Sequence, residues 1–181
     1  MPLTPATPDD IREVSLQLGR PARDIVAIAA RCVCGNPLVV QTKPRLADGT
    51  PFPTVYYLTH PGATAAVSTL EATGLMVQYQ ERLGTEADFA AAYQAAHTAY
   101  ISDRDAIAAA EGMKPVDEIA GISAGGMPTR VKCLHALVGH ALAAGRGLNP
   151  VGDLAIDECT WKQSICVCER PGNGTNAQPN G

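Results

Sequence analysis

Two cysteines separated by a single residue are the first feature of this chain that could do chemistry. Cys32 and Cys34 are followed by Gly35 and Pro37, residue types that favour a turn. Two thiols at this spacing can both reach one metal ion if the backbone turns there, and thiolates are ligands for zinc and iron. The alternative is a plain strand, whose alternation would send one thiol inward and the other outward without any metal.

A histidine stands at the far end of the segment that follows this cysteine pair. Residues 38–45 and 54–59 are typical of two strands, and residues 47–49 (Ala-Asp-Gly) supply a turn between them. His60 then ends the second strand, so it lies near the cysteine turn if strand 38–45 pairs with both neighbours. An imidazole nitrogen suits zinc and less often completes an iron–sulfur site. On its own, a His-Pro pair only marks the end of a strand.

A third cysteine lies in a segment that predicts a helix over residues 128–144. On a helix, Cys133 and His140 share a face, whereas Cys133 and His135 point in nearly opposite directions. Free cysteines are commonly small core residues, and either histidine could be an ordinary core or surface residue. The segment alone therefore leaves a chemical role open.

Three further cysteines lie near the C-terminus, and two of them repeat the spacing of the first pair. Cys166 and Cys168 could complete a four-thiolate site, which is chemically reasonable for a metal. The sequence favours this site less, because the pair borders residues 171–181, which we expect to form a disordered tail. No role follows for Cys159. The four thiols of this alternative are Cys32, Cys34, Cys166 and Cys168.

A glycine-rich connection ahead of the predicted helix indicates a different chemistry. Exposed backbone amides, the helix dipole and two cations would bind the phosphate or carboxylate of a small anionic substrate. Cys133 or His135 would then act as nucleophile or general base. The ordinary alternative is that the glycines serve the turn and the cations are solvated. The residues of this anion site are Gly125, Gly126, Arg130 and Lys132.

Composition restricts the class of protein. With 181 residues and 46% hydrophobic residues, the chain can form one domain with a core. A net charge of −4 argues against non-specific binding of nucleic acid. There is no apolar run of about 18 residues for a membrane span and no signal peptide, so we expect a cytoplasmic protein. In the cytoplasm, six cysteines favour metal binding, redox activity or burial over disulfides.

The pattern of apolar residues predicts a single α+β domain over residues 1–170. We expect a small antiparallel sheet of about three strands within residues 23–60, packed against several alanine-rich helices. The apolar run within residues 23–31 fits a buried strand, although a short helix has the same pattern. The longest helix is predicted over residues 86–111.

Two long segments resemble the bacterial domain-of-unknown-function family 501. They are RCVCGNPLVVQTKPRLADGTPFPTVYYLTHP (31–61) and EIAGISAGGMPTRVKCLHALVGHALAAGRGLNPVGD (118–153). The resemblance implies no established activity. Members of the family are cytoplasmic and are often encoded beside a septum-formation initiator and an exopolyphosphatase. This association implies, as one option, an adaptor for a cell-division or envelope protein.

In that family the position of His60 is commonly cysteine, which implies a set of four metal ligands. Three cysteines and one histidine suit zinc and can also hold an iron–sulfur cluster. Our leading hypothesis is a zinc ion or iron–sulfur cluster that links the hairpin to the 128–144 helix. Whether the protein is an enzyme stays open. The ligands implied by the resemblance are Cys32, Cys34, His60 and Cys133.

Overall fold

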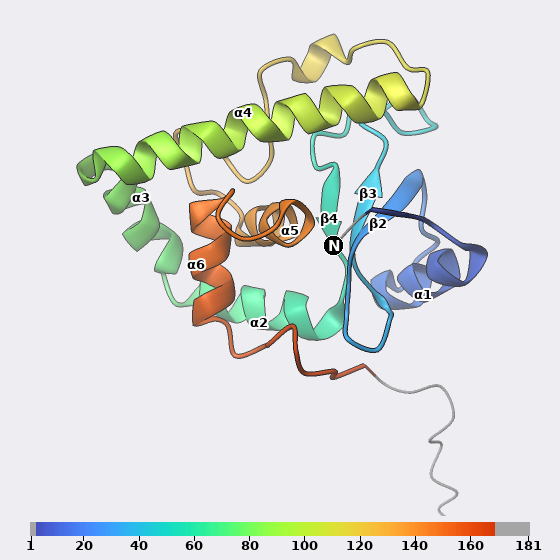
Figure 1. Cartoon of the computed structure of the whole chain (residues 1–181), viewed down its shortest axis with the longest axis horizontal. Helices are drawn as coiled ribbons and strands as arrows, with labels where there is room; N and C mark the ends of the chain where they lie inside the picture. The colour runs from blue at the N-terminus through green and yellow to red at the C-terminus, as the bar shows by residue number, and fades with distance from the viewer. Residues whose placement is uncertain (1–2, 169–181) are drawn as a thin grey trace, which may run out of the picture.

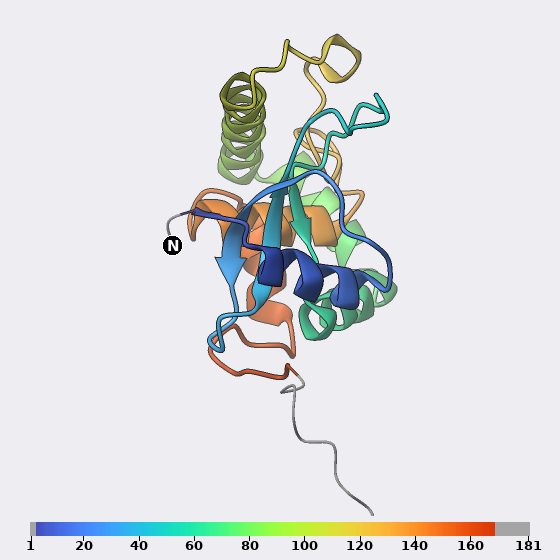
Figure 2. The same cartoon turned by 90° about the vertical axis from the view of Figure 1, so that its right-hand side faces the viewer.

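An antiparallel sheet with helices on both faces forms the centre of the molecule (Figures 1 and 2). The computed structural model describes residues 3–168, so the predicted tail at 171–181 lies outside the described residues. The α+β class and the antiparallel sheet are confirmed, and a two-residue edge strand adds to the three strands expected. In sheet order, the strands are β1 (Thr4–Pro5), β2 (Ile25–Arg31), β3 (Pro37–Thr42) and β4 (Tyr56–Leu58).

The helices differ in the layer that they occupy. Helix α1 (Pro8–Leu18) covers one face of the sheet, and the other helices lie on the opposite face or beside it (Figure 2). The longest of them confirms the prediction made for residues 86–111. Within residues 3–168 the helices are α1 (Pro8–Leu18), α2 (Pro61–Ala72), α3 (Leu75–Thr85), α4 (Ala87–Ala110), the 3₁₀ helix η1 (Asp117–Ile119), α5 (Leu134–Ala144) and α6 (Pro150–Glu158).

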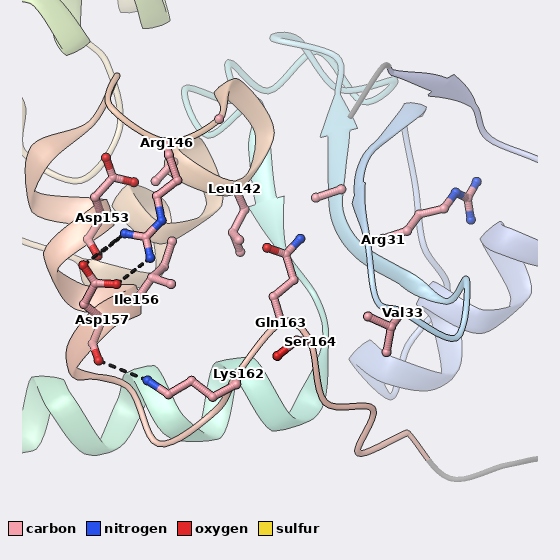
Figure 3. Close-up of a pocket in the computed structure, with 13 residues that line it drawn as sticks. Arg31, Val33, Leu142, Arg146, Asp153, Ile156, Asp157, Lys162, Gln163 and Ser164 are labelled. Carbon is pink, nitrogen blue, oxygen red and sulfur yellow. Dashed lines mark hydrogen bonds and ion pairs between the residues drawn. The ribbon is translucent and has the colours of Figure 1, made fainter.

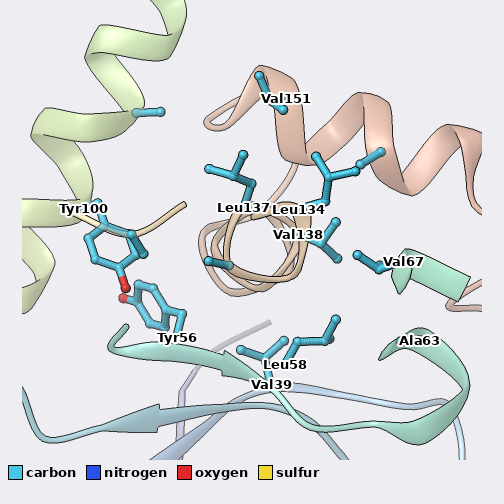
Figure 4. Packing of buried hydrophobic residues seen from close by; sticks show 14 of the residues in the cluster. Val39, Tyr56, Leu58, Ala63, Val67, Tyr100, Leu134, Leu137, Val138 and Val151 are labelled. Atoms are coloured by element: carbon cyan, nitrogen blue, oxygen red, sulfur yellow. The ribbon is translucent and has the colours of Figure 1, made fainter. Parts of the chain in front are cut away.

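Strands β2 and β3 are buried on both faces, which explains their nearly continuous apolar sequence. On one face, Ile28 and Val40 pack against Val14 of α1. On the other face, Val39 belongs to the main core beneath α5, together with Leu58 of β4 (Figure 4). The ambiguous run before the cysteine pair is therefore a buried strand, as favoured over the short helix.

Helix α5 lies at the centre of the main core (Figure 4). Leu134 and Leu137 are completely buried, and α5 packs on β4 and on α6. The approach to β4 is so close that a Cβ atom at Gly139 would lie 2.9 Å from the carbonyl oxygen of Tyr56. Glycine at this position therefore lets the helix lie directly on the strand.

The predicted start of this helix at residue 128 is wrong, because α5 begins at Leu134. The preceding residues form a compact loop closed by its own backbone. The amide of Arg130 donates to the carbonyl of Gly126 over 2.9 Å, and the amide of Lys132 donates to the carbonyl of Gly125 over 2.8 Å. These bonds replace the regular helical ladder, and Cys133 is left in an extended conformation just ahead of the helix.

The segment after α6 turns back toward the sheet. Residues 159–168 run past the turn between β2 and β3, although more than 100 residues separate the two in sequence (Figures 1 and 2). Trp161 is buried and lies against His60, with 5.9 Å between the ring centroids. This apolar contact holds the segment beneath the N-terminus of α2.

Across the described part of the chain, no helix has both the length and the apolar character that crossing a membrane requires.

Candidate metal centre

Four thiols from two distant segments meet below the β2–β3 turn. Their sulfur atoms all lie within 4.8 Å of one another. The Sγ atoms of Cys34 and Cys168 are 3.5 Å apart. All four are free thiols. The group consists of Cys32, Cys34, Cys166 and Cys168 and is called the four-cysteine cluster below.

The β2–β3 turn positions the first two thiols of this cluster. The amide of Gly35 donates to the carbonyl of Cys32, and the amide of Cys32 donates to the carbonyl of Asn36, each over 2.9 Å. Gly35 has a φ of 96°, a left-handed conformation that favours glycine. The backbone reverses directly after Cys34, so strand alternation no longer sends the two thiols to opposite faces.

The C-terminal segment brings the other two thiols to the turn by packing against the start of α2. Val167 lies between the two cysteines in sequence and rests on Gly62. A Cβ atom at position 62 would be only 2.5 Å from Cγ2 of Val167. Gly62 therefore provides the space that lets Cys166 and Cys168 approach the turn.

His60 contacts the cluster from the side as a hydrogen-bond donor. Its Nδ1 atom accepts the amide of Ala63 over 3.3 Å, so His60 caps the N-terminus of α2. The ring proton must then lie on Nε2, which is 3.0 Å from Sγ of Cys168. Burial lowers the pKa of His60, which keeps the ring neutral. His60 thus supports a sulfur ligand rather than replacing one.

Burial and hydrogen bonding give the thiols of the cluster different pKa values. Burial raises the pKa of Cys32 and of Cys168. Burial opposes ionisation of Cys34 as well, but hydrogen bonds from the Asn36 amide and the neighbouring thiols outweigh it and lower the pKa of that thiol. Burial of Cys32 and Cys168 therefore opposes the thiolate form that metal binding requires. A bound metal ion would supply the missing countercharge.

A pocket of about 630 Å³ lies beside the cluster (Figure 3). Val33, from the β2–β3 turn, faces the C-terminal residues Gln163 and Ser164 across it. The guanidinium of Arg31 points away from this space and pairs with the carboxylate of Asp10 over 2.6 Å. The turn and the C-terminal segment therefore line this pocket together.

The structure does not gather the ligand set implied by the family resemblance into one group. Cys32 and Cys34 lie together, and His60 contacts the cluster through Cys168. Cys133 instead belongs to a second group, with Glu71 and His135, whose ligand atoms also lie within 4.8 Å of one another. The β2–β3 turn therefore lies against the C-terminal segment, and the two Cys-x-Cys motifs together form one group of thiols.

The predicted anion-binding residues lie in the loop ahead of α5. Arg130 and Lys132 have exposed side chains, but their amides bond to carbonyls of the same loop, those of Gly126 and Gly125. The first amide of α5, that of Leu134, donates to the carboxylate of Glu71 over 2.6 Å. These amides are therefore already used by the protein itself, and anion binding at this loop stays a prediction.

Sequence reasoning gave too little weight to two groups of residues. The repeated Cys-x-Cys spacing was the available signal for Cys166 and Cys168, and Trp161 is the apolar anchor that places them. Glu71 carried no signal, because its neighbours in the second group lie more than 60 residues further along the chain.

Comparisons with known proteins identify a family and nothing closer. A family model described as "Protein of unknown function (DUF501)" matches residues 28–157. No curated protein and no solved structure matches the chain. The matched region contains one half of the four-cysteine cluster and ends before the other half, at Cys166 and Cys168.

Proposed function

We propose that this chain, which belongs to the DUF501 family of proteins of unknown function, binds one zinc ion through the four-cysteine cluster. The ion would join the β2–β3 turn to the C-terminal segment. This proposal replaces His60 and Cys133 of the earlier hypothesis by the second cysteine pair, and it leaves His60 as a hydrogen-bond donor to Cys168.

The observation that carries the proposal is the mutual proximity of the four sulfur atoms. Zinc–sulfur bonds are about 2.3 Å long, and a tetrahedral ion therefore places its sulfurs about 3.8 Å apart. The four sulfur atoms lie within 4.8 Å of one another, and Cys34 and Cys168 are 3.5 Å apart. Shifts of well under 1 Å would bring such a group to tetrahedral geometry.

The same proximity favours a single ion over an iron–sulfur cluster. In a cluster, thiolates bind different irons, and the irons and bridging sulfides keep those thiolates apart. A compact set of four sulfurs is instead typical of one tetrahedral ion, for which zinc is the common choice. A free thiol set of this kind also suits a reducing compartment such as the cytoplasm.

A site closed by four cysteines would be structural. All four positions on the zinc would be filled, so no position would remain for water or substrate. Binding of the ion would add directly to the stability of the fold, because its affinity for the folded site is part of the folding free energy. The zinc would hold residues 159–168 against the β2–β3 turn.

Metal content of matched cysteine variants tests the proposal. When both are purified under reducing conditions, Cys34→Ser is expected to contain one zinc ion per chain fewer than the wild type. Cys159→Ser is the matched control, because Cys159 lies in the same segment but outside the cluster, and it should keep the full metal content. Equal metal content in the two variants would refute the proposal, and iron in place of zinc would correct the identity of the ion.

The structure adds no test of the other two predicted functions. Catalysis on an anionic small molecule and an adaptor role toward a cell-division or envelope protein both remain predictions. A closed zinc site gives no support to catalysis, because it would exchange no ligand during function, and it does not bear on the adaptor role.

A further inference from the structure

A second group of metal-binding side chains lies at the junction of α2 and α5. It consists of the carboxylate of Glu71, the thiol of Cys133 and the imidazole of His135. Each offers one ligand atom, and these atoms lie within 4.8 Å of one another. All three side chains are partly buried, so the group is sheltered and still reachable from solvent.

The conformation of Cys133 explains how two residues so close in sequence reach the same point. On a helix, residues two apart point in nearly opposite directions. Cys133 precedes α5 with an extended backbone, at φ −154° and ψ 109°, so the helical rule does not apply to it. Its thiol therefore comes to the same side as His135, contrary to the expectation from a helix over residues 128–144.

Helix α2 supplies the rest of the site from one face. Thr64, Ser68 and Glu71 are spaced so that they share the side of α2 that meets α5. Glu71 accepts the amide of Leu134 over 2.6 Å, which fixes its carboxylate at the N-terminus of α5. Glu71 and His135 are thus held by two packed helices, and Cys133 directly precedes the second of them.

The orientation of His135 suits a metal ligand. Its Nε2 atom lies 3.1 Å from the carbonyl oxygen of Thr64, which can only accept, so Nε2 carries a proton. Its Nδ1 atom lies 3.1 Å from the carboxylate oxygen of Glu71, to which it donates while the ring is protonated. Histidines that bind metals commonly donate their second ring nitrogen to a carbonyl in this way, and binding of an ion would displace the proton from Nδ1.

A pocket of about 400 Å³ opens onto the group, and Cys133 and His135 line it. A small ligand in this pocket could therefore reach the thiol of Cys133 and the imidazole of His135.

We propose that Glu71, Cys133 and His135 bind a second zinc ion, with a fourth position open to this pocket. Three protein ligands and one exchangeable position are the arrangement of catalytic zinc sites, in which water or a substrate oxygen completes the tetrahedron. The ligand of the pocket would be a small polar molecule whose oxygen binds the ion. The site is independent of the four-cysteine cluster and shares none of its residues.

A thiol nucleophile activated by His135 is the competing explanation of the same three residues. In such an arrangement the carboxylate and the thiol face opposite nitrogens of the imidazole. Here Nε2 already contacts the carbonyl of Thr64 and the hydroxyl of Ser68, and Nδ1 faces the carboxylate of Glu71, so neither nitrogen is free to take the proton of the thiol. Convergence of the three groups on one point is the geometry of metal ligands.

Zinc content tests the second site separately from the first. Wild-type protein is expected to hold two zinc ions per chain. Cys133→Ser and Cys34→Ser should each hold one, and the double variant none. Glu71→Gln is a further variant that keeps an acceptor for the Leu134 amide, and it should also lose one ion. His97→Gln is the control, because His97 belongs to neither group and bonds instead with Ser123.

Cobalt substitution tests whether the second site is open. Added azide should change the visible spectrum of cobalt-loaded Cys34→Ser, which retains the second site, and leave that of Cys133→Ser unchanged. A single zinc in the wild type, lost in Cys34→Ser and kept in Cys133→Ser, would overturn the second site alone. If the second site holds no zinc and iodoacetamide rapidly alkylates Cys133, a role of this thiol as nucleophile would be favoured instead. Circular dichroism of each variant verifies that it is folded.

Discussion

Replacing Gly62 by alanine tests the packing that brings the C-terminal cysteines to the turn. The added Cβ atom would lie 2.5 Å from Cγ2 of Val167. Ordinary carbon–carbon contacts need about 3.5 to 4.0 Å, so Val167 must move by about 1 Å or more. Its neighbours in sequence, Cys166 and Cys168, would move with it. Zinc sites tolerate changes of only about 0.2 Å in the ligand distances.

Gly62→Ala is therefore expected to weaken zinc binding by about 10- to 100-fold, the range found when residues that support metal ligands are changed. Competition with a chromophoric chelator measures this change. The double variant Gly62→Ala with Val167→Ala removes both γ-methyl groups and should restore most of the affinity, while Val167→Ala alone should bind nearly as the wild type. Unchanged affinity in Gly62→Ala, or no recovery in the double variant, would refute the reasoning.

Three further substitutions test one contact of the four-cysteine cluster and two buried polar side chains of the core. His60→Phe keeps a ring but removes the donor to Cys168, so chelator competition should show zinc affinity about tenfold lower. Burial lowers the pKa of His140 to about 4, below the 6.5 of an unfolded chain, so unfolding takes up a proton. Denaturant titrations should therefore show about 3 kcal/mol of stability lost as the pH falls from 7 to 4, and His140→Gln should remove that dependence. Buried Arg104 donates to the carbonyls of Ile119 and Ile122, and Arg104→Leu leaves both unpaired. Thermal or chemical unfolding should show a loss of about 2 to 4 kcal/mol, and a loss under 1 kcal/mol would contradict this role.

The fold could be predicted from sequence where local patterns decide it. A continuous apolar run indicated the strand before the first cysteine pair, turn residues located the strands after it, and helical spacing located the helix over residues 86–111. Local signals failed at residues 128–133, where proline and apolar spacing predicted a helix. There, backbone bonds within the loop and a bond from Val131 to Gln80 of α3 hold the chain in another form. Contacts of this kind depend on distant elements.

The candidate site, too, could be predicted only where its residues are close together in the sequence. The Cys-x-Cys turn was recognisable from its own residues, and His60 contacts the cluster through Cys168. The partners of these thiols come from a segment more than 130 residues away, next to residues with a disorder-like composition. Their position depends on Trp161 packing against His60 and on the space above Gly62. Neither contact has a local signature in the sequence.

X-ray absorption at the zinc edge is the most direct measurement of the four-cysteine zinc site. Cys133→Ser protein should be used, because it would lack the second ion and leave a single zinc environment. We predict a shell of four sulfur atoms at about 2.3 Å, without a nitrogen or oxygen neighbour. A shell with a histidine nitrogen, or protein without zinc whose cysteines are joined in disulfides, would contradict the account.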